Sequence, residues 1–324
     1  LRAEIQAAKL VYSDSLKFAH EFIQDARLGQ QVDYAKSEAF VEGMIQSVIR
    51  NMDALVSLTK LRSYDEYTFT HSINVAVLSL AFGKHLALSP EEMRILGLAA
   101  LFHDVGKAMI PSEVLNKPGK LTDEEFEIIK SHPVRGYQFL KEQKRASKPI
   151  LLGIVDHHEK FNGRGYPRRL VGEAISPLGR LIALADVYDA LTSQRVYKPG
   201  MPPNKALGIM FEMRDQDFFP TYTERFIKCL GIYPVGSLVR LSSGELAVVC
   251  ASNPTAPLLP RVRVIRTPRM QPRAVVDLDL SVQEVPAQER LRIEDCLNHT
   301  ELGIDPLPYL EGTPETVPTG GKGA

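Results

Sequence analysis

Five histidines and two aspartates stand where their side chains could bind divalent metal ions. His103 and Asp104 are adjacent and end an apolar run, so both should be buried, and a buried carboxylate needs a cation or hydrogen-bond donors. His157 and His158 are also adjacent and directly precede a glycine-rich loop. Neighbouring imidazoles on a helix point about 100° apart, so they converge most easily where the helix ends. The complete candidate set is His71, His103, Asp104, His132, His157, His158 and Asp186.

Imidazole and carboxylate ligands together suit divalent ions such as Fe, Mn, Ni or Zn. Seven candidate ligands are too many for one ion and suit two. If Asp104 bridges, each ion has four protein ligands and keeps open positions for water and substrate, which is typical of a catalytic site. We therefore expect two divalent ions, Fe or Mn before Ni or Zn. The proposed division is His71, His103, Asp104 and Asp186 on the first ion, and Asp104, His132, His157 and His158 on the second.

The three remaining histidines are interpreted differently. His20 and His85 lie in apolar helical runs, where a lone histidine is more often a packed core residue than a ligand. His299 stands near the polar C-terminal tail without a partner motif. Asp189, one helical turn from Asp186, is expected to support a ligand or to pack within its helix, and not to bind metal.

Helical periodicity and capping signals predict the elements that must position these ligands. Ser89 with Pro90, and Thr122 with Glu125, are start signals of helices. Beyond Gly231 the sequence changes to short runs of β-branched residues, which predict three or four strands. The fold class is thus mainly α with a small C-terminal β appendage. Helices are expected at residues 1–28, 34–60, 70–87, 90–103, 122–141, 147–158, 176–193, 203–214 and 222–230.

Bulk composition narrows the function classes. The 324 residues carry 39 basic and 39 acidic side chains, and a neutral balance argues against broad binding to polymeric nucleic acid. The three cysteines are far apart and lack CxxC spacing, so we expect thiols in a reducing compartment, the cytoplasm. No run approaches the ~18 apolar residues of a membrane span. The chain begins at Leu1 inside an expected helix, so we expect an upstream segment to be missing.

Six ordered segments resemble the HD-GYP family, a branch of the HD superfamily of metal-dependent phosphohydrolases. They are YTFTHS (67–72), LFHDVGK (101–107), VLNKPGKLT (114–122), His132, HHEKFNGRGYP (157–167) and LADVYDALTSQRVYK (184–198). The resemblance implies an HD-type helical bundle with preceding helices. The division it implies is an N-terminal helical region at 1–62, a catalytic domain at 63–231, a small β appendage at 232–290 and a partly disordered tail at 291–324.

Two departures from the family pattern bear on the site. The usual pattern has Asp where Asn162 stands, and Asn can make the same local hydrogen bonds in a loop. Some members bind a third metal with help from a Glu one turn before the first histidine, a position that is Tyr67 here. We therefore expect an intact loop and two metals.

The resemblance implies a phosphodiesterase that hydrolyses cyclic di-GMP to linear pGpG, and whether a second cleavage then yields GMP stays open. Asp104 and Lys107 would be catalytic, with Lys107 adding positive charge at the scissile phosphate. Arg195 and Lys198 would bind the second phosphate or a guanine edge, which requires the Asp186 helix to end near residue 193. Gly165 and Tyr166, in the GYP loop, would contact substrate or partner proteins.

Three other functions stay open. The substrate could be another phosphate ester, such as cyclic GMP–AMP, linear pGpG or a mononucleotide. The chain could instead be a sensor that binds a cyclic dinucleotide without cleaving it. Relatives without catalytic activity usually lack one or more of the metal ligands, whereas all seven candidate ligands are present here. It could also be an interaction module that docks signalling proteins through the GYP loop. The helices over residues 1–60 either cover the core or pair with a second copy as a homodimer.

Overall fold

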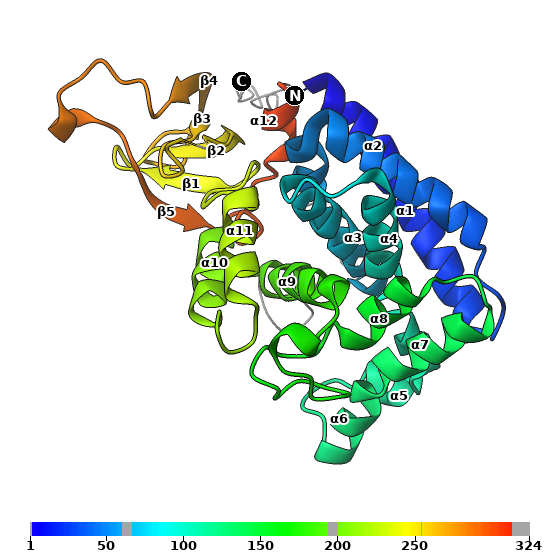
Figure 1. Cartoon of the computed structure of the whole chain (residues 1–324). Helices are drawn as coiled ribbons and strands as arrows, with labels where there is room; N and C mark the ends of the chain where they lie inside the picture. The colour runs from blue at the N-terminus through cyan, green and yellow to red at the C-terminus, as the bar shows by residue number, and fades with distance from the viewer. Residues whose placement is uncertain (1, 60–66, 194–199, 254, 313–324) are drawn as a thin grey trace.

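Two long helices form one side of the molecule. The computed structural model describes residues 2–59, 67–193, 200–253 and 255–312, and α1 (Arg2–Arg27) packs along α2 (Tyr34–Leu58) (Figure 1). Asp33 caps α2 by accepting from Lys36 N at 3.0 Å. At Asn51 the α2 backbone leaves helical geometry, and Asn51 Oδ1 accepts from Ala54 N at 3.0 Å, which restarts the helix.

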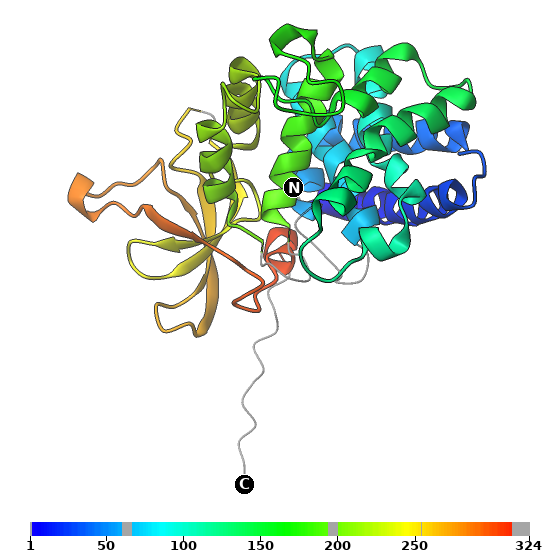
Figure 2. The same ribbon diagram turned by 90° about the horizontal axis from the view of Figure 1, so that it is seen from below.

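Five helices behind this pair carry the candidate ligands. α3 packs against α4 and α9, while α8 packs against α4, α7 and α9, and Figure 2 shows the bundle from below. Their facing sides are almost wholly apolar and buried, as Leu80, Phe82 and Phe102 illustrate. The expected mainly α fold is therefore confirmed. The bounds are α3 (Tyr67–His85), α4 (Pro90–Phe102), α7 (His132–Glu142), α8 (Lys148–Asp156) and α9 (Pro177–Thr192).

The helix expected over residues 122–141 is in fact two helices, so that prediction was wrong. The expected capping box of Thr122 and Glu125 does start α6. The helix then ends because the Ser131 hydroxyl donates to Ile128 O at 2.6 Å and Pro133 has no N–H to continue the ladder. The break places His132 at the first position of α7. The remaining helical elements are η1 (Val105–Met109), α5 (Ser112–Leu115), α6 (Asp123–Lys130), η2 (Gly172–Ala174), α10 (Pro203–Glu212), α11 (Pro220–Leu230), η3 (Ala287–Glu289) and α12 (Leu307–Glu311).

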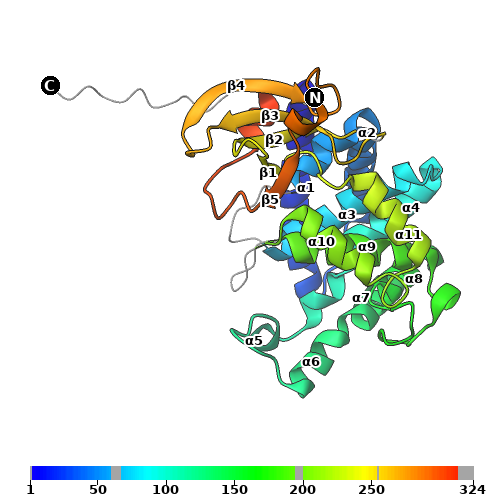
Figure 3. The same cartoon turned by 90° about the vertical axis from the view of Figure 1, so that its left-hand side faces the viewer.

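The C-terminal sheet is antiparallel and has five strands in the order β4-β3-β2-β1-β5, not three or four (Figure 3). β5 was not predicted from the sequence, because Glu294 and Asp295 interrupt the apolar pattern of that strand. Alternation sends Leu238 and Val248 toward the helical core and Val239 and Val249 into a second apolar cluster. The bounds are β1 (Leu238–Leu241), β2 (Leu246–Ala251), β3 (Arg261–Arg266), β4 (Pro272–Asp279) and β5 (Ile293–Leu297).

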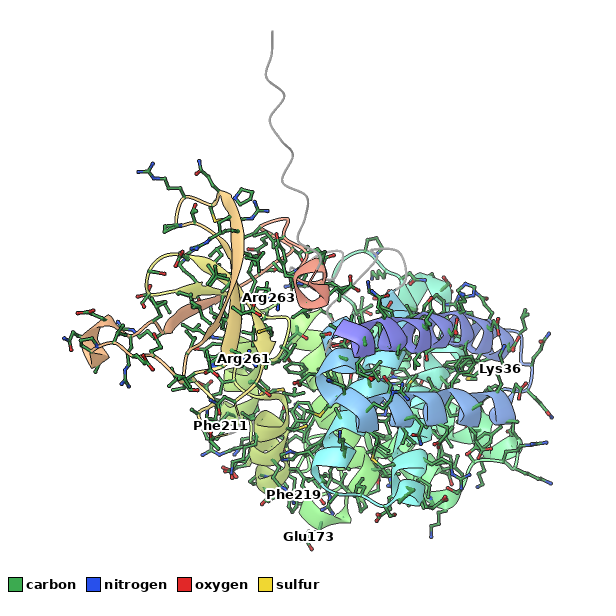
Figure 4. The ribbon with its side chains drawn as sticks, turned by 90° about the horizontal axis from the view of Figure 1, so that it is seen from above. Lys36, Glu173, Phe211, Phe219, Arg261 and Arg263 are labelled. Atoms are coloured by element: carbon green, nitrogen blue, oxygen red, sulfur yellow. The ribbon has the colours of Figure 1, made fainter. Side chains whose placement is uncertain are left out.

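The last described helix, α12, ties the sheet to the N-terminal helices. Arg263 on β3 forms a two-bond ion pair with Asp277 and also donates to Tyr309 O of α12 (Figure 4). On its other side, α12 receives a 2.9 Å hydrogen bond from Gln6 Nε2 to Glu311. In the part of the chain that the structure describes, no helix combines the length and apolarity of a membrane crossing.

Candidate metal centre

The seven predicted ligands, although scattered along the sequence, converge on one buried place. His71 comes from the first turns of α3 and Asp186 from the middle of α9, and the other five lie at helix ends or just beyond them. His157 is the C-cap of α8, so the backbone turns there and lets His158 face the same site. This confirms the expectation that the adjacent pair converges where a helix ends.

Asp104 is the centre of the cluster. Its Oδ1 lies 3.1 Å from His132 Nε2 and 3.9 Å from His157 Nε2. Its Oδ2 lies 3.4 Å from His103 Nε2 and 3.6 Å from His71 Nε2. One carboxylate therefore faces four imidazoles, two through each oxygen.

Asp186 adds a second carboxylate, which faces the same nitrogen of His71 as Asp104 does. Asp186 Oδ1 lies 3.1 Å from His71 Nε2, and Asp186 Oδ2 lies 3.8 Å from His158 Nδ1. His158 is the most open of the seven, with 24% of its side chain exposed. The site is thus buried on most sides and reaches solvent past His158.

Four of the imidazoles are held from behind through Nδ1. In His103, His132 and His157 this nitrogen lies 2.7, 2.7 and 2.6 Å from the carbonyl oxygen three residues earlier. In His71 it lies 2.8 Å from Asp189 Oδ2, so Asp189 supports a ligand as expected. Carbonyl and carboxylate oxygens can only accept, so each Nδ1 carries the proton and each neutral ring presents the lone pair of Nε2 to the centre.

If each ring carries only its Nδ1 proton, lone pairs of Nε2 face one another and the Asp104 carboxylate, an arrangement that a bound cation would satisfy. His132 Nε2 lies 3.4 Å from His157 Nε2 and also faces Asp104. Among the described residues, His103 Nε2 and Asp104 Oδ1 are buried without a hydrogen-bond partner, an arrangement that is costly unless a bound group satisfies them. The donor set therefore fits a divalent metal ion.

The expected division of the seven residues between two ions is matched in most respects by the groups of residues whose ligand atoms lie within 4.8 Å of one another. The set expected on the second ion forms one such group in full. The set expected on the first ion forms a group without Asp186, which instead joins His103 and His157. The three groups are Asp104, His132, His157 and His158; His71, His103 and Asp104; and His103, His157 and Asp186.

Burial and charge set the protonation states. Burial alone would raise the pKa of the Asp104 carboxyl, but the Lys107 ammonium and the nearby imidazoles hold that pKa well below its usual range. Burial, together with neighbouring imidazoles, holds the pKa of His157 well below its usual value. Burial also lowers the pKa of His158 to about 3. Asp104 is therefore kept anionic, and His157 and His158 are kept neutral, which are the forms that bind metal.

Lys107 is on η1 at the edge of the cluster. Its Nζ lies 2.6 Å from Asp104 Oδ2, and 26% of its side chain is exposed. Lys107 therefore places a partly solvent-exposed positive charge against the buried carboxylate.

The GYP loop is held against the site by a residue that sequence reasoning missed. Glu159 is buried, and its two oxygens accept from Arg168 N at 2.6 Å and Leu170 N at 2.9 Å. The Tyr166 ring lies 4.8 Å from the His158 ring. At Gly165 an added Cβ would lie 2.3 Å from Lys160 N, so only glycine fits there. The adjacency of Glu159 to the histidine pair was the available signal.

Two loop expectations have a clear outcome. Asn162 Oδ1 accepts from Arg164 N at 2.9 Å, which confirms its local capping role. Helix α9 ends at Thr192, as the proposed turn toward the metals requires. Arg195 and Lys198 themselves lie outside the described residues.

The histidines set aside as non-ligands do not belong to the metal-ligand groups found in the described part of the chain. The His20 ring lies 4.7 Å from the Phe69 ring. Both His20 and His85 are exposed, so the expectation that they are packed core residues was wrong. His299 lines a separate cavity of about 690 Å³ that also includes Tyr12 and Tyr188, and the described residues of its wall include none of the seven.

The fold and this cluster define an HD-type metal-binding domain. A family model described as "HD domain" matches residues 48–221, more than half of the chain, and the chain belongs to that family. The ordered segments and the GYP loop place it in the HD-GYP branch, so the resemblance is confirmed. It is 42% identical over 281 residues to "Cyclic di-GMP phosphodiesterase PA4108" of Pseudomonas aeruginosa, covering 86% of this chain and 68% of that protein.

Other relatives match this chain over only a part of their own length. A "Cyclic di-GMP phosphodiesterase" of Vibrio cholerae is 44% identical over 189 residues, which cover 54% of this chain and 38% of that protein. Proteins from the same organism named as 3′3′-cGAMP-specific phosphodiesterases also match. Bd1817, an HDG"Y"P protein from Bdellovibrio bacteriovorus, aligns with a TM-score of 0.57 at 22% identity over 68% of this chain and 70% of its own. That structure supports the fold.

Proposed function

We propose that the chain is a metal-dependent phosphodiesterase that hydrolyses cyclic di-GMP to linear pGpG, with a second cleavage to GMP left open. The observation that carries this proposal is the set of buried Nε2 lone pairs converging on the Asp104 carboxylate. The Pseudomonas aeruginosa relative, whose name states this activity, supports the choice of substrate.

The proposed ligands are the seven residues of the cluster, with Asp104 shared between two ions and Fe or Mn as the metals. Bound divalent ions lower the pKa of water and polarise phosphate oxygens. The protein's part is to keep Asp104 anionic, to fix the imidazoles through Nδ1, and to bury all but the His158 side of the site. Water is thereby excluded except where substrate enters.

Lys107 is the proposed cation for the scissile phosphate, because it already lies beside Asp104 and is partly exposed to solvent. Tyr166 and Gly165 are proposed to contact the substrate beside His158. Arg195 and Lys198 are proposed for the second phosphate or a guanine edge. We also propose the GYP loop as a docking site for protein partners. The helices of residues 1–60 are the proposed contact of a homodimer. The proposed compartment is the cytoplasm.

Product chromatography on metal-loaded protein tests the proposal. We expect cyclic di-GMP to be converted to pGpG, and Mn²⁺ or Fe²⁺ to restore activity after chelation. The presence or absence of GMP among the products shows whether cleavage stops at pGpG. Asp104→Asn keeps the size of the side chain but removes its charge, so it should lose both bound metal and turnover. Activity that survives chelation or Asp104→Asn would contradict the proposal.

The same assay separates the alternatives. Faster cleavage of cyclic GMP–AMP than of cyclic di-GMP would indicate the activity that the names of some relatives state. Tight binding of cyclic di-GMP without any product would indicate a sensor. Capture of a signalling protein that survives His103→Ala, in the absence of turnover by the wild type, would indicate an interaction module.

A further inference from the structure

A chain of buried hydrogen bonds runs from α1 to the metal centre. The Tyr12 hydroxyl lies 2.6 Å from Asn74 Oδ1, and Asn74 Nδ2 lies 2.9 Å from Asp189 Oδ1. The other oxygen of Asp189 lies 2.8 Å from His71 Nδ1. None of these four side chains is more than 7% exposed, so water competes little for the bonds.

The chemistry of the groups fixes the direction of each bond. The Asp189 carboxylate and the Thr59 carbonyl can only accept, and Asn74 Nδ2 lies 2.9 and 3.2 Å from them. The amide of Asn74 must therefore turn Nδ2 toward both. Its Oδ1 is left as an acceptor, so the Tyr12 hydroxyl donates.

We propose that Tyr12 and Asn74 are positioning residues for the metal centre, acting through Asp189 on His71. The inference rests on the proposed metal centre. An oxygen partner on the far nitrogen of a ligating histidine fixes its tautomer and orientation and raises its basicity. Asp189 is that partner, Asn74 sets the plane of its carboxylate, and Tyr12 holds Asn74 in place.

The consequence is that α1, which carries none of the seven ligands, sets the geometry of a ligand on α3. The Ser193 hydroxyl, 3.0 Å from Asp189 Oδ2, anchors the same carboxylate from the end of α9. A shift of α1 away from α3 would break the bond from Tyr12 first and loosen His71. The N-terminal helix is therefore coupled to metal affinity.

Calorimetric titration of metal-free protein with Mn²⁺ tests this directly. Asp189→Asn should weaken Mn²⁺ binding roughly 100-fold and Tyr12→Phe roughly 10-fold, the two ends of the range seen for outer partners of metal ligands. In the Asp189→Asn background, Tyr12→Phe should add little, because the path to His71 is already altered and coupled residues are not additive.

Ser15→Ala is the matched control. Ser15 is buried on the same helix, and its hydroxyl donates to Val11 O at 2.7 Å, within α1. Ser15→Ala should lower the melting temperature and leave Mn²⁺ affinity unchanged. If wild-type protein binds Mn²⁺ but Tyr12→Phe binds it equally well, or if the two effects simply add, the positioning role is overturned. Wild-type protein that binds no Mn²⁺ would overturn the proposed metal centre itself.

Discussion

Lys107 brings a positive charge to the metal centre through its ion pair with Asp104. It cannot be a ligand in this form, since an ammonium has no lone pair to offer. Its proposed role in catalysis is that of a fixed cation that would stabilise charge developing on the phosphate oxygens.

Lys107→Ala should therefore spare metal content and slow turnover. We expect kcat to fall on the order of 100-fold, the loss typical when one donor to a developing oxyanion is removed. Elemental analysis and steady-state kinetics measure the two quantities separately. Lys17→Ala, whose side chain is 74% exposed on α1, is the control and should change neither. Unchanged kinetics for Lys107→Ala would remove that residue from the mechanism.

The metal-free protein should lose stability in mild acid. Burial and neighbouring imidazoles hold the pKa of His157 well below 6.5 in the folded state, whereas the unfolded ring titrates near 6.5. Below that pH the unfolded state binds a proton that the folded state does not. The free energy of unfolding should then fall as pH drops from 7 to 5, by up to about 1.4 kcal/mol per pH unit for this ring.

The lowered pKa values of Asp104 and Asp186 act in the same direction at lower pH, because their stabilisation is lost as the carboxylates become protonated. Urea unfolding at a series of pH values measures the slope. His157→Gln should reduce the slope between pH 7 and 5 and leave the part that His158, whose pKa is lowered to about 3, contributes. A free energy of unfolding that is constant over this range in the wild type would contradict a neutral His157 in the folded protein.

The residues of the site differ in how readily the sequence reveals them. The ligands could be predicted because imidazoles and carboxylates are rare in apolar runs and because adjacent histidines need a helix end. Tyr12 and Asn74 could not, because the bonds that join them to each other and to Asp189 connect positions 62 and 115 residues apart. Only the packing of three helices brings those side chains together.

At the scale of elements, the close contact between η1 and α7 positions Asp104 against His132. An added Cβ at Gly106 would lie 1.9 Å from His132 O and 2.6 Å from Gly136 N. Both are backbone atoms, so they could move away only if the chain itself shifted. The glycine therefore allows the two ligand-bearing segments to touch.

Gly106→Ala should force η1 away from α7, lower the free energy of unfolding by about 3 kcal/mol, the upper end for overpacking, and weaken metal binding. Gly208 lies within α10 with nothing within 4 Å of an added Cβ, so Gly208→Ala should stabilise by about 0.5–1 kcal/mol. Thermal melts and metal titrations of both variants measure the difference. Wild-type stability and metal affinity in Gly106→Ala would contradict this packing argument.

Element boundaries could be predicted where a side chain caps a backbone and not where tertiary contacts decide. Ser89 and Thr122 cap their helices, as expected, and Ser89 also forms a capping box with Glu92 that was not predicted from the sequence. The end of α6 at Ser131 was missed, because the apolar period runs on through the break. β5 was missed since its pairing with β1, and not its own composition, makes it a strand.

At the scale of the whole molecule, one continuous cluster of buried apolar residues includes side chains of α1, α8, β2 and α12. Phe22 of α1 packs edge-on against Phe102 of α4, whose end carries His103. The N-terminal helices thus cover α4, the helix that His103 and Asp104, two of the proposed metal ligands, directly follow. Whether they also pair with a second copy stays a prediction.

The central claim is that the scattered histidines and aspartates hold two metal ions around one shared aspartate. Anomalous diffraction from crystals of Mn²⁺-loaded protein tests it most directly. We predict two peaks, both beside Asp104, one contacting His132, His157 and His158 and the other contacting His71. A single peak, or peaks that lie away from Asp104, would contradict the account.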